Sequence, residues 1–187
     1  MRSTIGALEA QPSGWKPPLT VSLPQLLVDG SDREFRRFVL NLHRVSTQMV
    51  KVRESIAALR GLTAPRYSIL MLIASEQGDA GISVRAVAEQ MKVSAPFVVT
   101  EVGFLIRARL VEKRKNPDDK RGVLLKLSQK GRSELERLAP KLRSVNDSLF
   151  GSLSAKDFAT LQRLCALLVQ NAEVALALLE ALARERE

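Results

Sequence analysis

The sequence has very few of the residues that build metal centres and catalytic sites. Its 187 residues include one cysteine, Cys165, and one histidine, His43. One cysteine cannot form an intramolecular disulfide, and one cysteine with one histidine cannot supply the four ligands of a structural zinc site. The sequence also lacks a glycine-rich phosphate loop and a nucleophile paired with a base. We therefore expect a protein that is not an enzyme and that holds no metal and no cofactor.

Aromatic residues are also scarce, at 4% of the sequence, whereas apolar residues make up 45% and are mostly leucine, valine and alanine. This mixture is typical of packed helices and disfavours an all-β architecture. A chain of this length can bury roughly 70% of its unfolded surface. We find no signal peptide and no apolar stretch that approaches the length of a membrane-spanning helix, so we expect a cytoplasmic protein without a membrane partner.

Positive charge is concentrated in one part of the chain. Residues 107–132 contain ten Lys and Arg against three Asp and Glu, a net charge of +7. The whole chain carries +9, so the other 161 residues carry only +2. Charge gathered in this way predicts a face that binds a polyanion. The alternative is an ordinary solvated strand edge that lysine protects from pairing with another strand.

Long helices are predicted at both ends of the chain. After a flexible N-terminal arm, residues 1–30, apolar residues recur in alternating steps of three and four over residues 31–61. The residues that follow this spacing are Phe35, Phe38, Leu42, Val45, Met49, Val52, Ile56 and Leu59. Heptad spacing over about seven turns favours a helix–helix interface between subunits. Residues 132–187 carry a second apolar stripe, with a capping box at Ser154 and Asp157, so we assign both ends to dimerisation.

The middle of the chain, residues 62–131, is predicted to form one lobe. Thr63 can cap its first helix, Ser83 caps a second, short helix, and Ser94 caps the next one. Two helices joined as closely as the last two match a helix-turn-helix. A basic β-hairpin follows at residues 111–128.

This order of elements resembles the multiple-antibiotic-resistance regulator (MarR) family of winged helix-turn-helix transcription factors, over about residues 32–185. The resemblance is carried by Leu62-Thr63 with Tyr67 and Leu70, by Val87-Ala88 with Ser94, and by Asn116-Pro117-Asp118-Asp119-Lys120-Arg121-Gly122 followed by Leu127-Ser128 and Gly131. It implies a mainly α-helical fold with a small β-wing. It also implies a homodimer that binds a palindromic operator in double-stranded DNA and often releases it when a small ligand binds.

The wing tip carries the residues that the resemblance places closest to DNA. Arg121 would enter the minor groove, where a narrow A·T-rich width favours a guanidinium. Asp119 would hold that guanidinium through an ion pair, and its alternative role is that of an ordinary turn carboxylate beside Pro117. The other basic candidates for DNA contact are Arg107, Arg109, Lys113, Lys115 and Lys120.

The helix that begins after Ser94 is the candidate for the major groove. Its residues that we assign to DNA contact are Ser94, Ala95, Pro96, Val98 and Thr100. Few of them form hydrogen bonds, so direct readout is expected to be sparse. Ala95 or Val98 would meet thymine methyl groups, whereas Thr100 would bond a base or a phosphate. Glu101 is expected to face away from phosphate or to accept from a cytosine amino group.

The end of this helix departs from the family pattern. Arg109 stands where many relatives have glycine. A non-glycine residue in a left-handed cap costs on the order of 1 kcal/mol, so we expect the helix, which runs to about Arg109, to end in another way.

The resemblance also implies an effector pocket near His43, Arg44 and Tyr67. The two basic residues would suit an anionic ligand such as an aromatic carboxylate or its coenzyme A thioester. The alternatives are a core aromatic for Tyr67 and ordinary surface or interface positions for His43 and Arg44.

The leading functional hypothesis is therefore a ligand-responsive, dimeric DNA-binding repressor. One alternative is a winged helix used for protein contacts or for DNA binding without sequence preference. Another is a thiol redox sensor that acts through Cys165, although a thiol on the apolar side of the last helix is expected to be protonated and unreactive.

Overall fold

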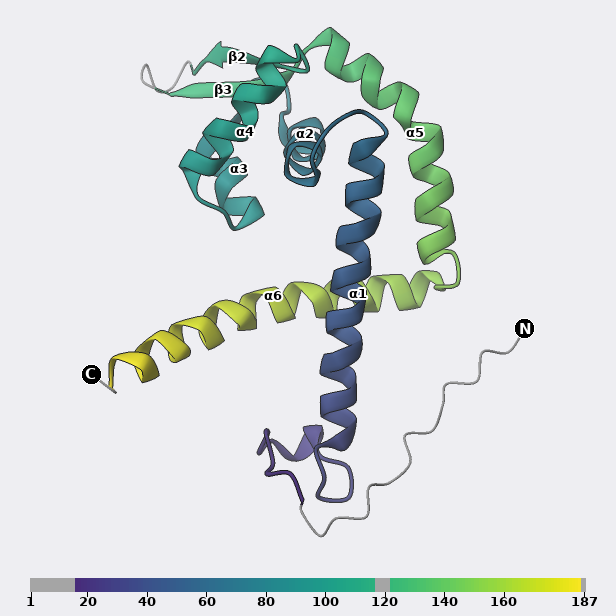
Figure 1. The fold of residues 1–187 in the computed structure, drawn as a ribbon, viewed down its shortest axis with the longest axis vertical. Coiled ribbons are helices and arrows are strands. Elements are labelled where there is room, and N and C mark those ends of the chain that lie inside the picture. Colours follow the sequence, from purple (N-terminus) through teal and green to yellow (C-terminus); the bar gives the residue numbers. More distant parts are fainter. Residues whose placement is uncertain (1–15, 117–121, 186–187) are drawn as a thin grey trace. The chain divides into compact units, whose positions relative to one another are not determined.

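The computed structural model describes residues 16–116 and 122–185. The chain divides into two compact units, and the boundary falls between Ala64 and Pro65. The first unit contains the N-terminal arm and the first long helix. The second contains the helix-turn-helix, the hairpin and two C-terminal helices. The fold is mainly helical with one small antiparallel sheet, so the predicted fold class is confirmed (Figure 1).

Helix α1, Arg33–Ala58, is the long helix predicted near the N-terminus. Beyond its end, Gly61 has a φ of 63°, a left-handed conformation that glycine adopts without strain. Residues of the heptad pattern remain in contact with solvent, among them Phe38, Leu42 and Val45. The single chain therefore leaves apolar surface uncovered along α1.

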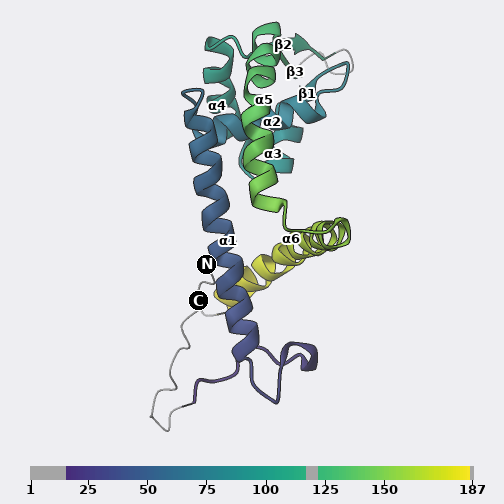
Figure 2. The same ribbon diagram turned by 90° about the vertical axis from the view of Figure 1, so that its right-hand side faces the viewer.

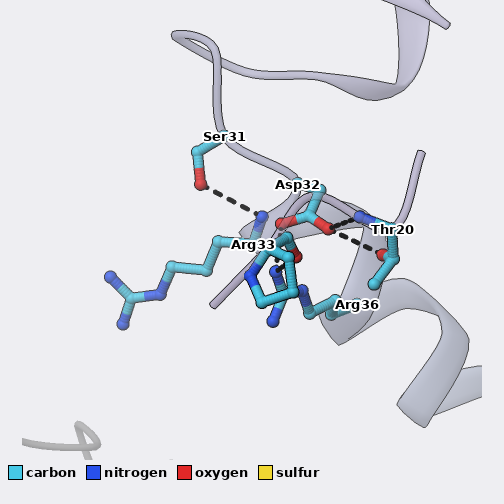
Figure 3. Close-up of polar contacts among 6 residues, drawn as sticks. Thr20, Ser31, Asp32, Arg33 and Arg36 are labelled. Carbon is cyan, nitrogen blue, oxygen red and sulfur yellow. Dashed lines mark hydrogen bonds and ion pairs between the residues drawn. The ribbon is translucent and has the colours of Figure 1, made fainter. Parts of the chain in front are cut away.

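A buried carboxylate holds the arm against the start of α1 (Figure 3). Asp32 is 2% exposed, and its Oδ2 accepts hydrogen bonds from the backbone N–H of Thr20 at 2.8 Å and from its hydroxyl at 2.6 Å. Its Oδ1 accepts from Nη2 of Arg36 at 2.7 Å, and the same nitrogen donates to the carbonyl of Pro18 at 2.9 Å. A short 3-10 helix, η1 (Pro24–Leu26), interrupts the loop between these contacts. This part of the arm is thus anchored to its own helix.

The Asp32 contacts predict how the arm responds to pH. The hydrogen bonds from Arg36 and Thr20 lower the pKa of the Asp32 carboxyl well below its usual value of 3.8. The pKa of this carboxyl is lower in the folded protein than in the unfolded chain. The ionised carboxylate therefore stabilises the fold at pH values above 3.8, and this stabilisation is lost as the pH falls toward the pKa of the folded state. We expect the protection of the Thr20 amide from hydrogen exchange to persist at neutral and mildly acidic pH and to be lost only in stronger acid.

The Asp32→Asn variant is expected to lose this protection already at neutral pH, because a neutral amide binds the Arg36 guanidinium weakly. Ser31→Ala is the control, since it removes only a hydroxyl that accepts from the Arg33 N–H at 3.3 Å. Equal Thr20 protection in Asp32→Asn and in the wild type would show that the carboxylate does not hold the arm.

Three helices follow: α2 (Ala64–Glu76), α3 (Val84–Met91) and α4 (Ala95–Arg107). The predicted helix-turn-helix is formed by α3 and α4. The hydroxyl oxygen of Ser83 caps α3 by accepting from the N–H of Ala86 at 3.1 Å. The hydroxyl oxygen of Ser94 caps α4 by accepting from the N–H of Phe97 at 3.3 Å. Both predicted caps are confirmed.

A three-stranded antiparallel sheet lies beside these helices, in the order β1-β3-β2 (Figure 1, Figure 2). Its strands are β1 (Ile82–Ser83), β2 (Val111–Lys115) and β3 (Val123–Leu127). Strands β2 and β3 form the predicted hairpin, in which Lys113 is opposite Leu125. Strand β1 was not predicted, because two residues show no alternation and become a strand only when Ile82 pairs with Leu125.

The core of the second unit is built from leucine, isoleucine and valine. Its largest fully buried side chains are Ile69, Ile73, Val87, Val98, Val102, Leu105 and Leu125. They come from α2, α3, α4 and the central strand β3. Because α4 contributes three of them, its rotation about its own axis is fixed by packing.

Two long helices complete the chain, α5 (Gln129–Phe150) and α6 (Ala155–Arg184). The predicted capping box of α6 is confirmed: the hydroxyl oxygen of Ser154 accepts from the Asp157 N–H, and the Asp157 carboxylate accepts from the Ser154 N–H, both at 3.2 Å. No residue of α6 is buried. Its exposed apolar side chains include Phe158, Leu161, Leu164, Leu168, Leu178 and Leu182.

Helix α6 also corrects the expectation about membrane-spanning length. Its most apolar 18-residue window has a mean hydropathy of 1.6, so by length and composition alone this helix could cross a membrane. The expectation that no stretch approaches that length was wrong. Polar residues such as Asn171 and Glu173 interrupt the apolar run without lowering its average much. A helix whose apolar side chains are covered by another subunit has a similarly apolar composition.

The end of α4 also differs from the prediction. Arg109 has a φ of 59°, so a non-glycine residue does occupy the left-handed position. The N–H of Arg109 donates to the Ile106 carbonyl at 2.8 Å, and that of Leu110 donates to the Leu105 carbonyl at 2.9 Å. The carbonyl of Arg109 accepts from the Ser128 hydroxyl at 2.6 Å. These hydrogen bonds offset a backbone cost of about 1 kcal/mol.

Candidate nucleic-acid interface

Helix α4 presents one face to solvent because its opposite face is built into the core. The core side consists of Val98, Val102 and Leu105. Residues spaced by three and four on the opposite side are Pro96, Thr100, Gly103 and Arg107, which we call the outward face of α4. Of the residues predicted to contact DNA, Ser94, Ala95, Pro96, Thr100 and Arg107 are all exposed. These side chains are therefore accessible to a groove of DNA.

The prediction that Val98 meets thymine methyl groups was wrong. Its side chain is 0% exposed, because it packs into the core of the lobe. Its neighbour Val99 is 56% exposed and is the valine that faces solvent. The sequence could not separate two adjacent valines without knowing how α4 is rotated.

The hydroxyl groups near the start of α4 are already engaged in local hydrogen bonds. The oxygen of Ser94 caps the helix, as described above. The hydroxyl of Thr100 donates to the carbonyl of Pro96 at 3.1 Å. Both oxygens keep only part of their hydrogen-bonding capacity, so the first turns of α4 offer mostly apolar contacts.

Glu101 is held by a partner that the sequence did not reveal. Nε of Arg66 on α2 donates to Oε2 of Glu101 at 2.9 Å, and both side chains are largely buried. The Cζ atoms of Arg66 and Arg107 lie 3.7 Å and 4.3 Å from the centroid of the Phe104 ring. Glu101 therefore points to α2. No local pattern links Arg66 to Glu101, which is 35 residues away along the chain.

The hairpin carries the basic side chains of the wing. Lys113 and Lys115 are exposed on β2, where they alternate with Arg114, which pairs with Glu112 on the same strand at 2.8 Å. Both lysines are thus available to a polyanion. The predicted tip residues Asp119, Lys120 and Arg121 lie outside the described residues, so their roles stay predictions.

The base of the wing is tied to the start of α5. The hydroxyl oxygen of Ser128 accepts from the Gly131 N–H at 2.9 Å, as a helix cap does, and the hydroxyl itself donates to the Arg109 carbonyl. Nζ of Lys130 donates to the Ala108 carbonyl at 3.0 Å. Arg109 is exposed at this junction. These contacts fix the wing relative to α4.

The residues assigned to an effector pocket lie in both units. His43 and Arg44 are exposed on α1, whereas Tyr67 is buried in α2. The pocket stays a prediction. Among the described residues no group of three His, Cys, Asp or Glu is placed to hold a metal ion. Cys165 is exposed on α6.

Comparison with known proteins finds similarity to one family. A model of the MarR family matches residues 60–122. The HTH-type transcriptional repressor YetL of Bacillus subtilis (strain 168) is 30% identical over 101 residues, which cover 54% of this chain and 60% of YetL. The chain therefore spans less than two thirds of that repressor.

Two solved structures share the fold. A cysteine-to-serine mutant of MarR from E. coli, complexed with operator DNA, has a TM-score of 0.60 at 23% identity and covers 72% of this chain and 95% of that one. The S. aureus MepR–DNA complex has a TM-score of 0.61 at 15% identity, and the match covers 70% of this chain and 93% of MepR.

The sequence signature, the family match and the fold agree with one another. The match over residues 60–122 spans the helix-turn-helix and the first strand of the hairpin. The solved structures extend the shared fold to about 70% of the chain. The chain therefore has the winged helix-turn-helix fold, and its residues 60–122 are similar to the MarR family.

Proposed function

We propose that this protein is a dimeric transcriptional regulator, acting as a repressor in the cytoplasm, that binds a palindromic operator in double-stranded DNA. The observation that carries this proposal is an outward face on α4 that is followed directly by a hairpin in a segment of net charge +7. A helix of this kind suits the major groove, and a basic wing suits the phosphates and the minor groove beside it. The similarity to YetL, a transcriptional repressor, and the presence of DNA in the MarR and MepR structures support the same partner.

A dimer supplies the two-fold symmetry that a palindrome requires. The single chain exposes apolar side chains along α1 and along the whole of α6. Apolar patches of this length on a soluble protein mark an interaction surface. A second copy of the same chain, which brings the same two helices, would cover them.

Salt dependence tests the proposed binding. We expect the logarithm of the association constant to fall linearly with the logarithm of salt concentration, by about 0.9 for each phosphate neutralised. A binding constant that does not change with salt would contradict the proposal.

Arg121→Ala is expected to weaken binding by about 1–3 kcal/mol, and Arg163→Ala on α6 is a control with the same change of charge. Equal affinity of Arg121→Ala and wild type would show that Arg121 makes no contact.

We further propose that a small anionic effector releases the operator. The support is the basic pair His43 and Arg44, both exposed on α1, together with the family resemblance. Benzoate and benzoyl-coenzyme A serve as probes for an aromatic carboxylate and its thioester. A ligand that binds only the folded protein raises its melting temperature by mass action, and here it should also weaken operator binding. If neither benzoate nor benzoyl-coenzyme A raises the melting temperature or weakens operator binding, the proposed effector class is wrong.

A further inference from the structure

Helix α4 has almost no side chain that can read a base pair through two hydrogen bonds. The residue types that do so for guanine or adenine in the major groove are arginine, lysine, asparagine and glutamine. Within Ala95–Arg107, only Arg107 belongs to this group. The first turns offer apolar groups and two hydroxyls that are already engaged. Any paired hydrogen bonding from α4 to a base therefore depends on one residue.

The side chain of Arg107 lies back along α4, toward the start of the helix. Its Nη1 is 3.6 Å from the position that a Cβ on Gly103 would occupy, and its Cζ lies over the ring of Phe104. Gly103 is one turn before Arg107 on the outward face, which also carries Thr100. The guanidinium is thus held over this face, closer to the first turns of α4 than its own Cα.

The ring of Phe104 is itself held in place from α2. The Arg66 guanidinium lies over the same ring, and Arg66 is fixed by its hydrogen bond to Glu101. The side chains of Arg66 and Glu101 are 23% and 14% exposed, so water competes little for this pair. An aromatic ring attracts a cation through its quadrupole and leaves the N–H groups of a stacked guanidinium free.

We propose, building on the DNA binding proposed above, that Arg107 is the specificity-determining residue of α4 and donates two N–H groups to a guanine in each half-site. Phe104 is its positioning residue. A guanidinium that is ordered before DNA arrives loses little side-chain freedom on binding. The Phe104 ring holds the Arg107 Cζ at 4.3 Å from the ring centroid, and paired hydrogen bonds to one base edge require a donor group that is held in place. A contact to phosphate needs no such order, since any cation within reach serves.

The test uses the full-length protein and defined duplexes. One duplex carries the site that the wild-type protein selects from a randomised library, and a second is a shuffled duplex of equal length and composition. A third set replaces each G·C pair of the half-site in turn. Arg107→Ala is expected to lose about five- to 150-fold of discrimination at one G·C pair in each half-site. Arg107→Lys keeps the charge and can still donate to guanine, but an ammonium does not stack on the Phe104 ring as a guanidinium does, so we expect part of the same discrimination to be lost.

Phe104 is tested by a pair of substitutions. Phe104→Leu keeps an apolar side chain and removes the ring, so we expect weaker discrimination at the same G·C pair and at no other position. Phe104→Tyr retains the ring and is expected to restore wild-type discrimination. If Phe104→Leu weakens binding equally at every position, or if Phe104→Tyr fails to restore discrimination, the positioning role of Phe104 is overturned.

Three outcomes separate this inference from the proposed function. If the wild type does not distinguish the selected duplex from the shuffled one, both proposals are overturned. If the wild type distinguishes them and Arg107→Ala does so equally well, DNA binding stands and the role of Arg107 is overturned. If Arg107→Ala weakens binding to both duplexes by the same factor, Arg107 contacts phosphate and the assignment to a base is wrong.

Discussion

Gly131→Ala is expected to destabilise the protein by about 1–3 kcal/mol, toward the upper end of the range measured for overpacked sites. A Cβ on Gly131 would lie 2.1 Å from the carbonyl oxygen of Leu110 and 3.1 Å from its carbonyl carbon. Neither atom belongs to a flexible side chain. The Leu110 oxygen also accepts from the Ser128 N–H at 3.1 Å, so moving it away strains the link between the wing and α5. Alanine is nevertheless the better helix former, so local propensity predicts the opposite sign.

Urea unfolding at a fixed protein concentration measures this change. Gly103→Ala is the matched control, because it adds the same methyl group inside a helix where the nearest atom is 3.6 Å away, at ordinary contact distance. The control should be neutral or more stable than the wild type by up to about 1 kcal/mol. If Gly131→Ala is as stable as Gly103→Ala, the start of α5 does not approach Leu110 as described.

Leu168→Glu is expected to break the proposed dimer. Leu168 lies in the exposed apolar stripe of α6, and in a two-fold interface the substitution buries two carboxylates. The effective penalty of burying an unpaired charge is several kcal/mol, so a total of about 4 kcal/mol would raise the dimer dissociation constant roughly a thousandfold. The monomer should keep its fold, because no residue of α6 is buried in the single chain.

Sedimentation over a range of protein concentrations measures the dissociation constant. Gln170→Glu adds the same charge on the other side of α6, where Gln162, Arg163 and Glu173 also lie, and should leave the dimer intact. If Leu168→Glu and Gln170→Glu dimerise equally, the apolar stripe of α6 is not the subunit interface.

Local signals were sufficient to predict most of the fold. Serine caps at Ser83, Ser94 and Ser154 each place a helix start, because a side-chain oxygen must satisfy the free N–H groups there. Spacing by three and four predicted the long helices. Charge density and turn residues predicted the hairpin. These features depend on neighbours within a few residues, and the printed sequence contains all of them.

Features that depend on distant partners were not predictable. Strand β1 exists only through its pairing with β3, and the Arg66–Glu101 ion pair joins two helices. The burial of Val98 follows from the rotation of α4, which is set by the whole core. Arg109 occupies a left-handed position, and one of the hydrogen bonds that stabilise it comes from Ser128 at the start of α5. In the candidate interface, the sequence therefore predicts which residues are basic and not how they are held.

The proposed function requires that this winged helix binds one DNA sequence in preference to others. Its most direct measurement compares the wild-type affinity for the duplex it selects with that for the shuffled duplex, at one fixed salt concentration. We expect a ratio of roughly 10³ or more, and a symmetric selected site whose halves are about one helical turn apart. Equal affinity for the two duplexes would contradict it.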